Sequence, residues 1–173
     1  VLDVSESPMT LLRPGDVTVD MLEAVLGEPI HIPGAVLAAL AEGQTARSPG
    51  LKHTHYAPAA PLTVVTGTPE HIAAYIKDQG LRYTENGRTL GILASSESAD
   101  QYRDARVISL GSRRAPREMA HSLFSALRRM DAWGVDAILA EGIAPRGEGL
   151  AFMNRLLRAA GFATVDADRE AGL

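Results

Sequence analysis

Apolar residues in the second half of the chain fall into short runs that alternate with longer amphipathic segments. Each short run has the length and the β-branched content of a buried strand, and turn residues separate it from the next segment. Strands that alternate with helices in this way predict a parallel sheet with helices on both faces. We therefore predict a small Rossmann-like α/β domain over residues 62–173, with strands at 62–65, 90–93, 105–110, 136–140 and 163–165.

Three amphipathic helices are predicted between these strands. The first begins at Thr68-Pro69, a capping residue followed by a proline in the first turn, and is expected to end at Gly80. The second opens at Pro116 and is the longest, and the third follows Gly147-Glu148-Gly149 and closes at Gly161. Positions expected to face the core are Ile72, Ala73, Tyr75, Ile76, Ala120, Leu123, Phe124, Leu127, Met130, Leu150, Met153, Leu156, Leu157 and Ala160.

The first 30 residues follow another pattern. Apolar runs at 1–4 and 10–13 flank a turn-like Ser-Glu-Ser-Pro segment, which predicts a hairpin or two neighbouring strands. Thr18 fits a helix N-cap and Gly27 fits the position after its C-terminus, so a short helix is expected between them. Its apolar face would carry Met21, Leu22 and Val25.

Residues 28–61 lack a clear period, apart from one or two possible helical turns at 35–40. Within them lies the sequence SPGLKHTHYAP, residues 48–58, which we call the strap. Its prolines exclude a helix or a central strand. An extended strap of this kind is either a plain linker or a loop that reaches into a site, and its histidines and tyrosine keep the second interpretation open.

Composition narrows the class of protein. The chain is 46% hydrophobic and 22% charged, as in ordinary globular proteins, and contains no run near the roughly 18 apolar residues of a membrane span. It has no cysteine and no charged-then-apolar leader, so we expect a cytoplasmic protein without membrane attachment. The chain opens at Val1 without a methionine, and we expect it to be a fragment or a cleaved product.

The charge balance argues against strong unaided binding of this chain to a nucleic-acid backbone. Its net charge is −4, whereas unaided binding to a nucleic-acid backbone rests on Lys and Arg that neutralise phosphates. Two small basic clusters, Arg113-Arg114 with Arg117 and Arg128-Arg129, are interpreted as solvated charges near helix ends rather than as contacts to RNA or to a nucleotide.

The α/β region offers no catalytic motif of its own, since no GxGxxG, Walker A or GxSxG pattern occurs in it. The Gly147-x-Gly149 pair could present backbone N–H groups to an anion, although a flexible loop is the favoured interpretation. His53 and His55 would share one face of an extended strap, but no third ligand has a clear spacing, so no metal site is predicted.

Three motifs carry a resemblance to a known family. The strap resembles the interdomain linker of the long, two-domain threonylcarbamoyl-AMP synthases, S-P-G-M-K-x-x-H-Y-x-P, with Leu51 in place of the usual methionine. The sequence GLAFMNRL at 149–156 is similar to a helix of their C-terminal domain, and LRPG at 12–15 to the end of their catalytic YrdC-type domain. The resemblance implies three parts: the end of a YrdC-type domain at 1–30, a linker at 31–61 and the Rossmann-like domain at 62–173.

The resemblance also implies an activity. The family joins L-threonine, bicarbonate and ATP, with Mg²⁺, into threonylcarbamoyl-AMP, which downstream tRNA-modifying proteins use. By matching position, Arg13 is implied to lie near the nucleotide and threonine pocket, against the alternative of an edge-strand arginine paired with a carboxylate. In the strap, Lys52 is predicted to meet phosphate or carboxylate oxygens, and His55 and Tyr56 to close over a bound ligand, against the alternative that the strap only packs on the domain surface. The family's Lys-x-Arg and Ser-x-Asn motifs match nothing here, so the catalytic residues stay unknown and the chain alone is expected to be inactive.

A second interpretation stays open from the residues themselves. The chain would then be a Rossmann-like module that binds a small molecule or docks to a partner, and that performs no catalysis.

Overall fold

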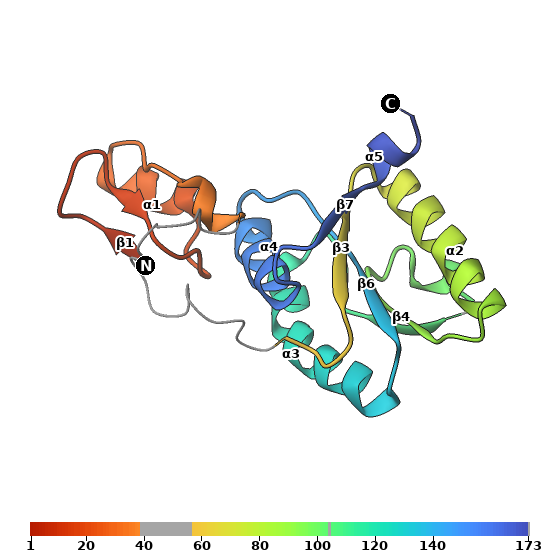
Figure 1. Cartoon of the computed structure of the whole chain (residues 1–173). Helices are drawn as coiled ribbons and strands as arrows, with labels where there is room; N and C mark the ends of the chain where they lie inside the picture. The colour runs from red at the N-terminus through yellow and green to blue at the C-terminus, as the bar shows by residue number, and fades with distance from the viewer. Residues whose placement is uncertain (39–56, 104, 173) are drawn as a thin grey trace.

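A five-stranded parallel sheet lies at the centre of the larger part of the molecule in the computed structural model, which describes residues 1–38, 57–103 and 105–172 (Figure 1). All neighbouring strands pair in parallel. This confirms the predicted Rossmann-like α/β class. In spatial order the strands are β5 (Arg106–Ser109), β4 (Leu90–Ala94), β6 (Ala137–Glu141), β3 (Leu62–Thr66) and β7 (Thr164–Asp166).

Helices cover both faces of this sheet. Helix α2 (Pro69–Glu85) lies on one face, whereas α3 (Pro116–Trp133) and α4 (Glu148–Ala159) lie side by side on the other (Figure 1). Strand β6 shows the consequence, because all of its residues are buried. Ile138 and Ala140 belong to the core under α3 and α4, while Ala137 and Leu139 belong to the core under α2.

Helix α2 is longer than the sequence indicated. The predicted end at Gly80 is wrong, because the helix continues to Glu85 with Gly80 buried inside it, and the left-handed residue is Gly87 (φ +65°). A glycine inside a helix costs about 1 kcal/mol relative to alanine. Tyr83, one turn further on, packs against the core under α2, and this packing favours continuing the helix.

The buried stripe of α3 differs from the predicted stripe, most clearly at Phe124. Phe124 was expected to face the core but is half exposed, and the Arg128 guanidinium lies 5.5 Å from its ring centroid. With about 100° of rotation per residue, the buried residues of α3 fall within one arc of the helix, and Phe124 lies outside that arc. The residues that do so are Met119, Leu123, Ala126, Leu127 and Met130.

The C-terminal residues form a short helix that the sequence did not predict, α5 (Ala167–Glu170). The Asp166 carboxylate caps it by accepting from the backbone N–H groups of Asp168 and Arg169. Asp168 in turn accepts from the Thr68 N–H at 2.9 Å and pairs with His71 Nδ1 at 2.7 Å. The polar end of the chain is therefore attached to the start of α2.

The N-terminal part, residues 1–38, contains the predicted strands and helix, and each strand is two residues long. Strands β1 (Leu2–Asp3) and β2 (Thr10–Leu11) form an antiparallel pair. Helix α1 (Val19–Leu26) begins at Thr18, whose hydroxyl accepts from the Met21 N–H at 3.3 Å, and ends at Gly27 in the left-handed region. The helical turns expected at 35–40 are reduced to one 3₁₀ turn, η1 (Gly34–Val36), among the described residues.

The N-terminal part packs against α4 (Figure 1), and Asp16 forms an ion pair with Arg117 at the start of α3 at 3.4 Å. Leu11, Ile30 and Val36 form a small buried cluster with Leu150 of α4. Asn154 of α4 is buried and donates a hydrogen bond from Nδ2 to the Val36 carbonyl at 2.5 Å.

Candidate functional site

Of the four residues predicted to contact substrate or nucleotide, the structure describes one. Lys52, His55 and Tyr56 lie outside the described residues. Arg13 lies two residues after the end of β2 and is exposed, and its carbonyl accepts a hydrogen bond from the N-terminal ammonium group of Val1 at 2.7 Å.

Arg13 faces another cation, Arg158 of α4. Burial is the larger reason that the pKa of the Arg158 guanidinium is lowered, and the positive charge of Arg13 lowers it further. Arg158 also donates from Nε to Asn154 Oδ1 at 3.3 Å. Asn154 thus connects the Val36 carbonyl on one side to this arginine pair on the other.

The described residues on both sides of the gap at 39–56 are held by the α/β part. Val36 bonds to Asn154 of α4, as described above. Beyond the gap, the Ala57 carbonyl accepts from Arg128 Nη2 at 3.0 Å, and the Ala59 N–H donates to Asp131 Oδ1 at 2.7 Å, both on α3. Arg128 is therefore more than the solvated charge that its sequence position indicated.

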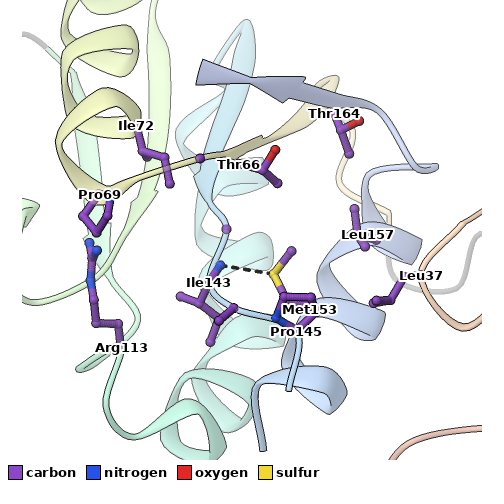
Figure 2. Close-up of a pocket in the computed structure, with 13 residues that line it drawn as sticks. Leu37, Thr66, Pro69, Ile72, Arg113, Ile143, Pro145, Met153, Leu157 and Thr164 are labelled. Atoms are coloured by element: carbon purple, nitrogen blue, oxygen red, sulfur yellow. Dashed lines mark hydrogen bonds between the residues drawn. The ribbon is translucent and has the colours of Figure 1, made fainter. Parts of the chain in front are cut away.

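A cavity of about 660 Å³ opens at the carboxyl edge of the sheet. Strand β3 leads into α2 on one face of the sheet and its neighbour β6 leads towards α4 on the other, so the chain diverges between the two strand ends. Such switch points are where open α/β sheets commonly bind ligands. The walls of the cavity come from the loops after β3 and β6, from α4, and from Leu37 of the N-terminal part (Figure 2).

Two glycines set the shape of the loop that borders this cavity. A Cβ atom added to Gly149 would lie 2.3 Å from the Ala144 carbonyl oxygen, and one added to Gly142 would lie 3.0 Å from the Val65 carbonyl oxygen. Glycine at 149 therefore lets the loop after β6 fold back onto the start of α4. This close approach, rather than an anion-binding role, is the observed reason for the glycine at 149.

Beside the cavity lies a buried carboxylate, Glu141, which is the last residue of β6 and is 1% exposed. It accepts hydrogen bonds from the Ser95 N–H at 3.0 Å, from Ser98 Oγ at 2.5 Å and from Tyr102 Oη at 2.5 Å. Arg113 Nη2 donates to it at 3.2 Å. We call these five residues the Glu141 cluster.

The Glu141 cluster supplies hydrogen bonds and a countercharge to a carboxylate that would otherwise be costly to bury. Removing a carboxylate from water costs several kcal/mol unless donors and a countercharge replace the lost hydration. Tyr102 is a fixed donor here, because burial and its hydrogen bond to Glu141 raise the pKa of its phenol far above the usual range. The loops after β4 and β5 are thereby fastened to the end of β6.

Arg113 was interpreted as a solvated helix-end charge, and that interpretation is wrong. Its side chain is 22% exposed, and Nη2 donates to Ser95 Oγ at 2.8 Å as well as to Glu141. Its Nε atom is buried and has no hydrogen-bond partner. The sequence signal that could have found the cluster is the glutamate that ends a fully buried apolar strand.

A second carboxylate, Glu97, holds the loop that carries Arg113. Burial by itself would raise the pKa of the Glu97 carboxyl, but hydrogen bonds from Ser112 Oγ at 2.6 Å and from the Arg113 N–H at 3.1 Å outweigh it. Together with the Arg113 charge they lower the pKa of Glu97 to about 2. Glu97 is therefore ionised at neutral pH.

Within residues 1–38, 57–103 and 105–172, no three histidine, aspartate or glutamate side chains are placed to hold a metal ion. In the same ranges, no helix has the length and apolar character needed to cross a membrane.

Residues 17–161 match the family model described as threonylcarbamoyl-AMP synthase, C-terminal domain. Threonylcarbamoyl-AMP synthase of Pyrococcus abyssi is 41% identical over 95% of this chain and 46% of its own length. That of Bacillus subtilis is 41% identical over 93% of this chain and 44% of its own length. The protein of the same name from Schizosaccharomyces pombe is 30% identical over 88% and 39%.

Solved structures agree with these relatives. The crystal structure of P. abyssi Sua5 complexed with L-threonine superposes with a TM-score of 0.82, at 40% identity over 96% of this chain and 46% of that one. The C-terminal Sua5 domain of Pyrococcus horikoshii matches with a TM-score of 0.52, at 40% identity over 64% of this chain and 99% of that one.

This chain spans less than half the length of the curated relatives that it matches. The family match nevertheless covers most of the residues of this chain, and it includes α1, the four strands β3 to β6, and helices α2, α3 and α4. The chain therefore belongs to the threonylcarbamoyl-AMP synthase C-terminal-domain family.

Proposed function

We propose that this chain is the C-terminal portion of an L-threonylcarbamoyladenylate synthase. Such an enzyme makes threonylcarbamoyl-AMP from L-threonine, bicarbonate and ATP, and the product supports threonylcarbamoyladenosine modification of tRNA by downstream proteins. The observation that carries the proposal is 41% identity over 95% of the chain to a protein named threonylcarbamoyl-AMP synthase. A solved relative named as a complex with L-threonine supports threonine as a substrate.

We further propose that Arg13, Lys52, His55 and Tyr56 contact the substrate or the nucleotide in the intact enzyme. His55-Tyr56 is the one adjacent His-Tyr pair in this sequence. A solved P. abyssi Sua5 variant, which superposes with a TM-score of 0.82 at 38% identity, carries alanine at an adjacent histidine and tyrosine. That engineered pair supports a functional role for the corresponding residue types in the strap.

The proposed division of the chain is 1–30 for the end of a YrdC-type domain, 31–61 for the linker and 62–173 for the C-terminal domain. The P. horikoshii C-terminal domain, which 64% of this chain matches almost end to end, supports the last unit. The division is consistent with a positioning role for this chain, because α3 holds Ala57 and α4 holds Val36, on the two sides of residues 39–56.

ATP and Mg²⁺ belong to the proposed reaction of the intact enzyme. Mg²⁺ would neutralise charge on the phosphates of ATP during adenylyl transfer. The described acidic residues of this chain provide no three-residue group for such an ion, so its ligands are proposed to lie on the phosphates and elsewhere in the intact enzyme. We place the activity in the cytoplasm, and we do not propose direct tRNA contact for a chain of net charge −4.

The test is pyrophosphate release by the intact, two-domain protein that contains this chain, with ATP, L-threonine, bicarbonate and Mg²⁺. We expect turnover with the full set, little without threonine, and none from the 173-residue chain alone. Pyrophosphate release by the intact protein that does not depend on threonine would contradict the proposal. Turnover by this chain alone at a rate comparable with the intact protein would show that the site lies in the α/β part.

A further inference from the structure

The cavity at the carboxyl edge of the sheet combines apolar walls with one charged side chain. Ile72, Ile143, Met153 and Leu157 form much of the wall, and Arg113 is the one charged residue among the described residues that line it (Figure 2). A volume of about 660 Å³ and a mostly apolar lining with few polar groups are typical of small-molecule sites.

Two donor groups of residues that line this cavity lack a good acceptor. The buried Nε of Arg113 has no hydrogen-bond partner. The Ile143 N–H donates to the thioether sulfur of Met153 at 3.3 Å, and a thioether is a weak acceptor (Figure 2, dashed line). Donors in this state favour a ligand that brings an acceptor oxygen.

The surrounding charges limit what that ligand can be. Arg113 already lies 3.2 Å from the Glu141 carboxylate and 3.9 Å from that of Glu97, so its positive charge is shared between two anions. A doubly charged phosphate would add twice as much to this local excess of negative charge as a singly charged carboxylate. Asp168, which accepts from the Thr68 N–H, likewise already occupies the N-terminus of α2. A single planar carboxylate matches the remaining donors of the guanidinium best.

We propose that this cavity binds a small organic carboxylate with an apolar body, with the carboxylate at Arg113 and the body against Ile143, Met153 and Leu157. The proposal goes beyond the proposed synthase activity and does not depend on it. Leu37 of the N-terminal part also lines the cavity, so an occupant would touch both parts of the molecule.

The first experiment compares two probes of the same shape, 2-naphthoate and its neutral amide 2-naphthamide, titrated into the 173-residue chain by ligand-observed NMR. We expect naphthoate to bind at least tenfold more tightly than the amide, because a hydrogen bond to a charged group corresponds to roughly tenfold to hundredfold in affinity. Equal binding of the two probes, or no binding of either, would overturn the proposal.

Two variants locate the binding. Thr164→Trp adds a large side chain at an exposed position that lines the cavity, and we expect it to abolish naphthoate binding. Ala132→Trp adds the same side chain at an exposed position of α3 that does not line the cavity, and binding should persist. If Thr164→Trp binds naphthoate as the unmodified chain does, the probe sits elsewhere and the proposal is wrong.

A third variant tests the role of Arg113 while keeping its charge for Glu141. Arg113→Lys replaces the planar fork by a point charge, so naphthoate should bind about tenfold more weakly while the amide changes little. An unchanged ratio of the two affinities would show that Arg113 does not contact the carboxylate. The pyrophosphate assay of the intact protein is a separate measurement, so failure here leaves the synthase proposal standing.

Discussion

The two parts of this molecule bury their apolar residues to very different extents. The α/β part encloses a core on each face of its sheet, and β4 and β6 are buried along their whole length. In the N-terminal part, α1 has no buried residue, and Met21 and Val25 are 54% and 85% exposed. The predicted apolar face of α1 is thus exposed in this chain, except that Leu22 packs against the small cluster at α4.

This difference in burial indicates that the N-terminal part depends on the α/β part for its stability. A helix without a buried face gains little from packing, and a pair of two-residue strands is marginal by itself. The N-terminal part instead relies on its contacts with α4, through Leu150 and Asn154, and on an ion pair between Asp16 and Arg117 at 3.4 Å. The following predictions test this one-way dependence.

The largest effect is expected from the Glu141 cluster. Glu141→Ala would leave Ser95, Ser98, Tyr102 and Arg113 without their shared acceptor, and should lower the free energy of unfolding by about 3–5 kcal/mol. Urea unfolding measures this, and Glu85→Ala, an exposed glutamate at the end of α2, is the matched control. A loss no larger than that of the control would show that the cluster does not hold the α/β part together.

The strap should affect function without affecting the α/β core. In the intact enzyme, His55→Ala or Tyr56→Ala is expected to weaken binding of ATP or of the intermediate by roughly tenfold to hundredfold, which corresponds to about 1.5–3 kcal/mol. Isothermal titration measures binding, and thermal unfolding of the same variants is the control. Unchanged binding and turnover in both variants would leave the strap as a linker only.

Asn154 tests the connection between the two parts. Asn154→Ala removes the buried hydrogen bond to the Val36 carbonyl and should cost about 1–2 kcal/mol. We expect faster amide hydrogen exchange in residues 30–37 and unchanged exchange in the strands of the sheet. The neighbouring exposed residue provides a control, Arg155→Ala, which should change neither.

Acid should weaken the loop that carries Arg113. The folded-state pKa of Glu97, about 2, lies below its ordinary value of 4.5, so the ionised form stabilises the fold above pH 4.5. This contribution is lost as the pH falls from 4.5 towards 2. Unfolding midpoints measured across this window should fall less steeply in Glu97→Gln, and an identical pH dependence of the two proteins would contradict the assignment.

The smallest effect is expected on the exposed face of α1. Val25→Ser should change the stability of this chain by less than about 0.5 kcal/mol, because the side chain is 85% exposed. The matched variant in the α/β part, Leu123→Ser on α3, buries a hydroxyl in a well-packed core and should be far more harmful. Comparable losses in the two variants would mean that α1 is packed after all.

Local sequence patterns were enough to predict most of the strands and helices of this protein. Buried runs and helical periods predicted the five parallel strands and the three helices between them, because these signals depend on neighbours a few residues apart. Thr18 and Gly27 likewise placed α1 correctly, since capping is local. The family was evident from the strap and from the GLAFMNRL helix.

Tertiary structure alone decided the rest. The strand order β5-β4-β6-β3-β7 brings Glu141 beside Ser95 and Arg113, which are 46 and 28 residues away in the sequence, and no local signal encodes that meeting. Distant contacts also decide that Gly80 stays helical, because Tyr83 packs against the core beyond it. They likewise decide that the polar C-terminal residues form α5, which is attached to the start of α2. In each case burial and hydrogen bonding to distant residues outweigh a local preference of about 1 kcal/mol.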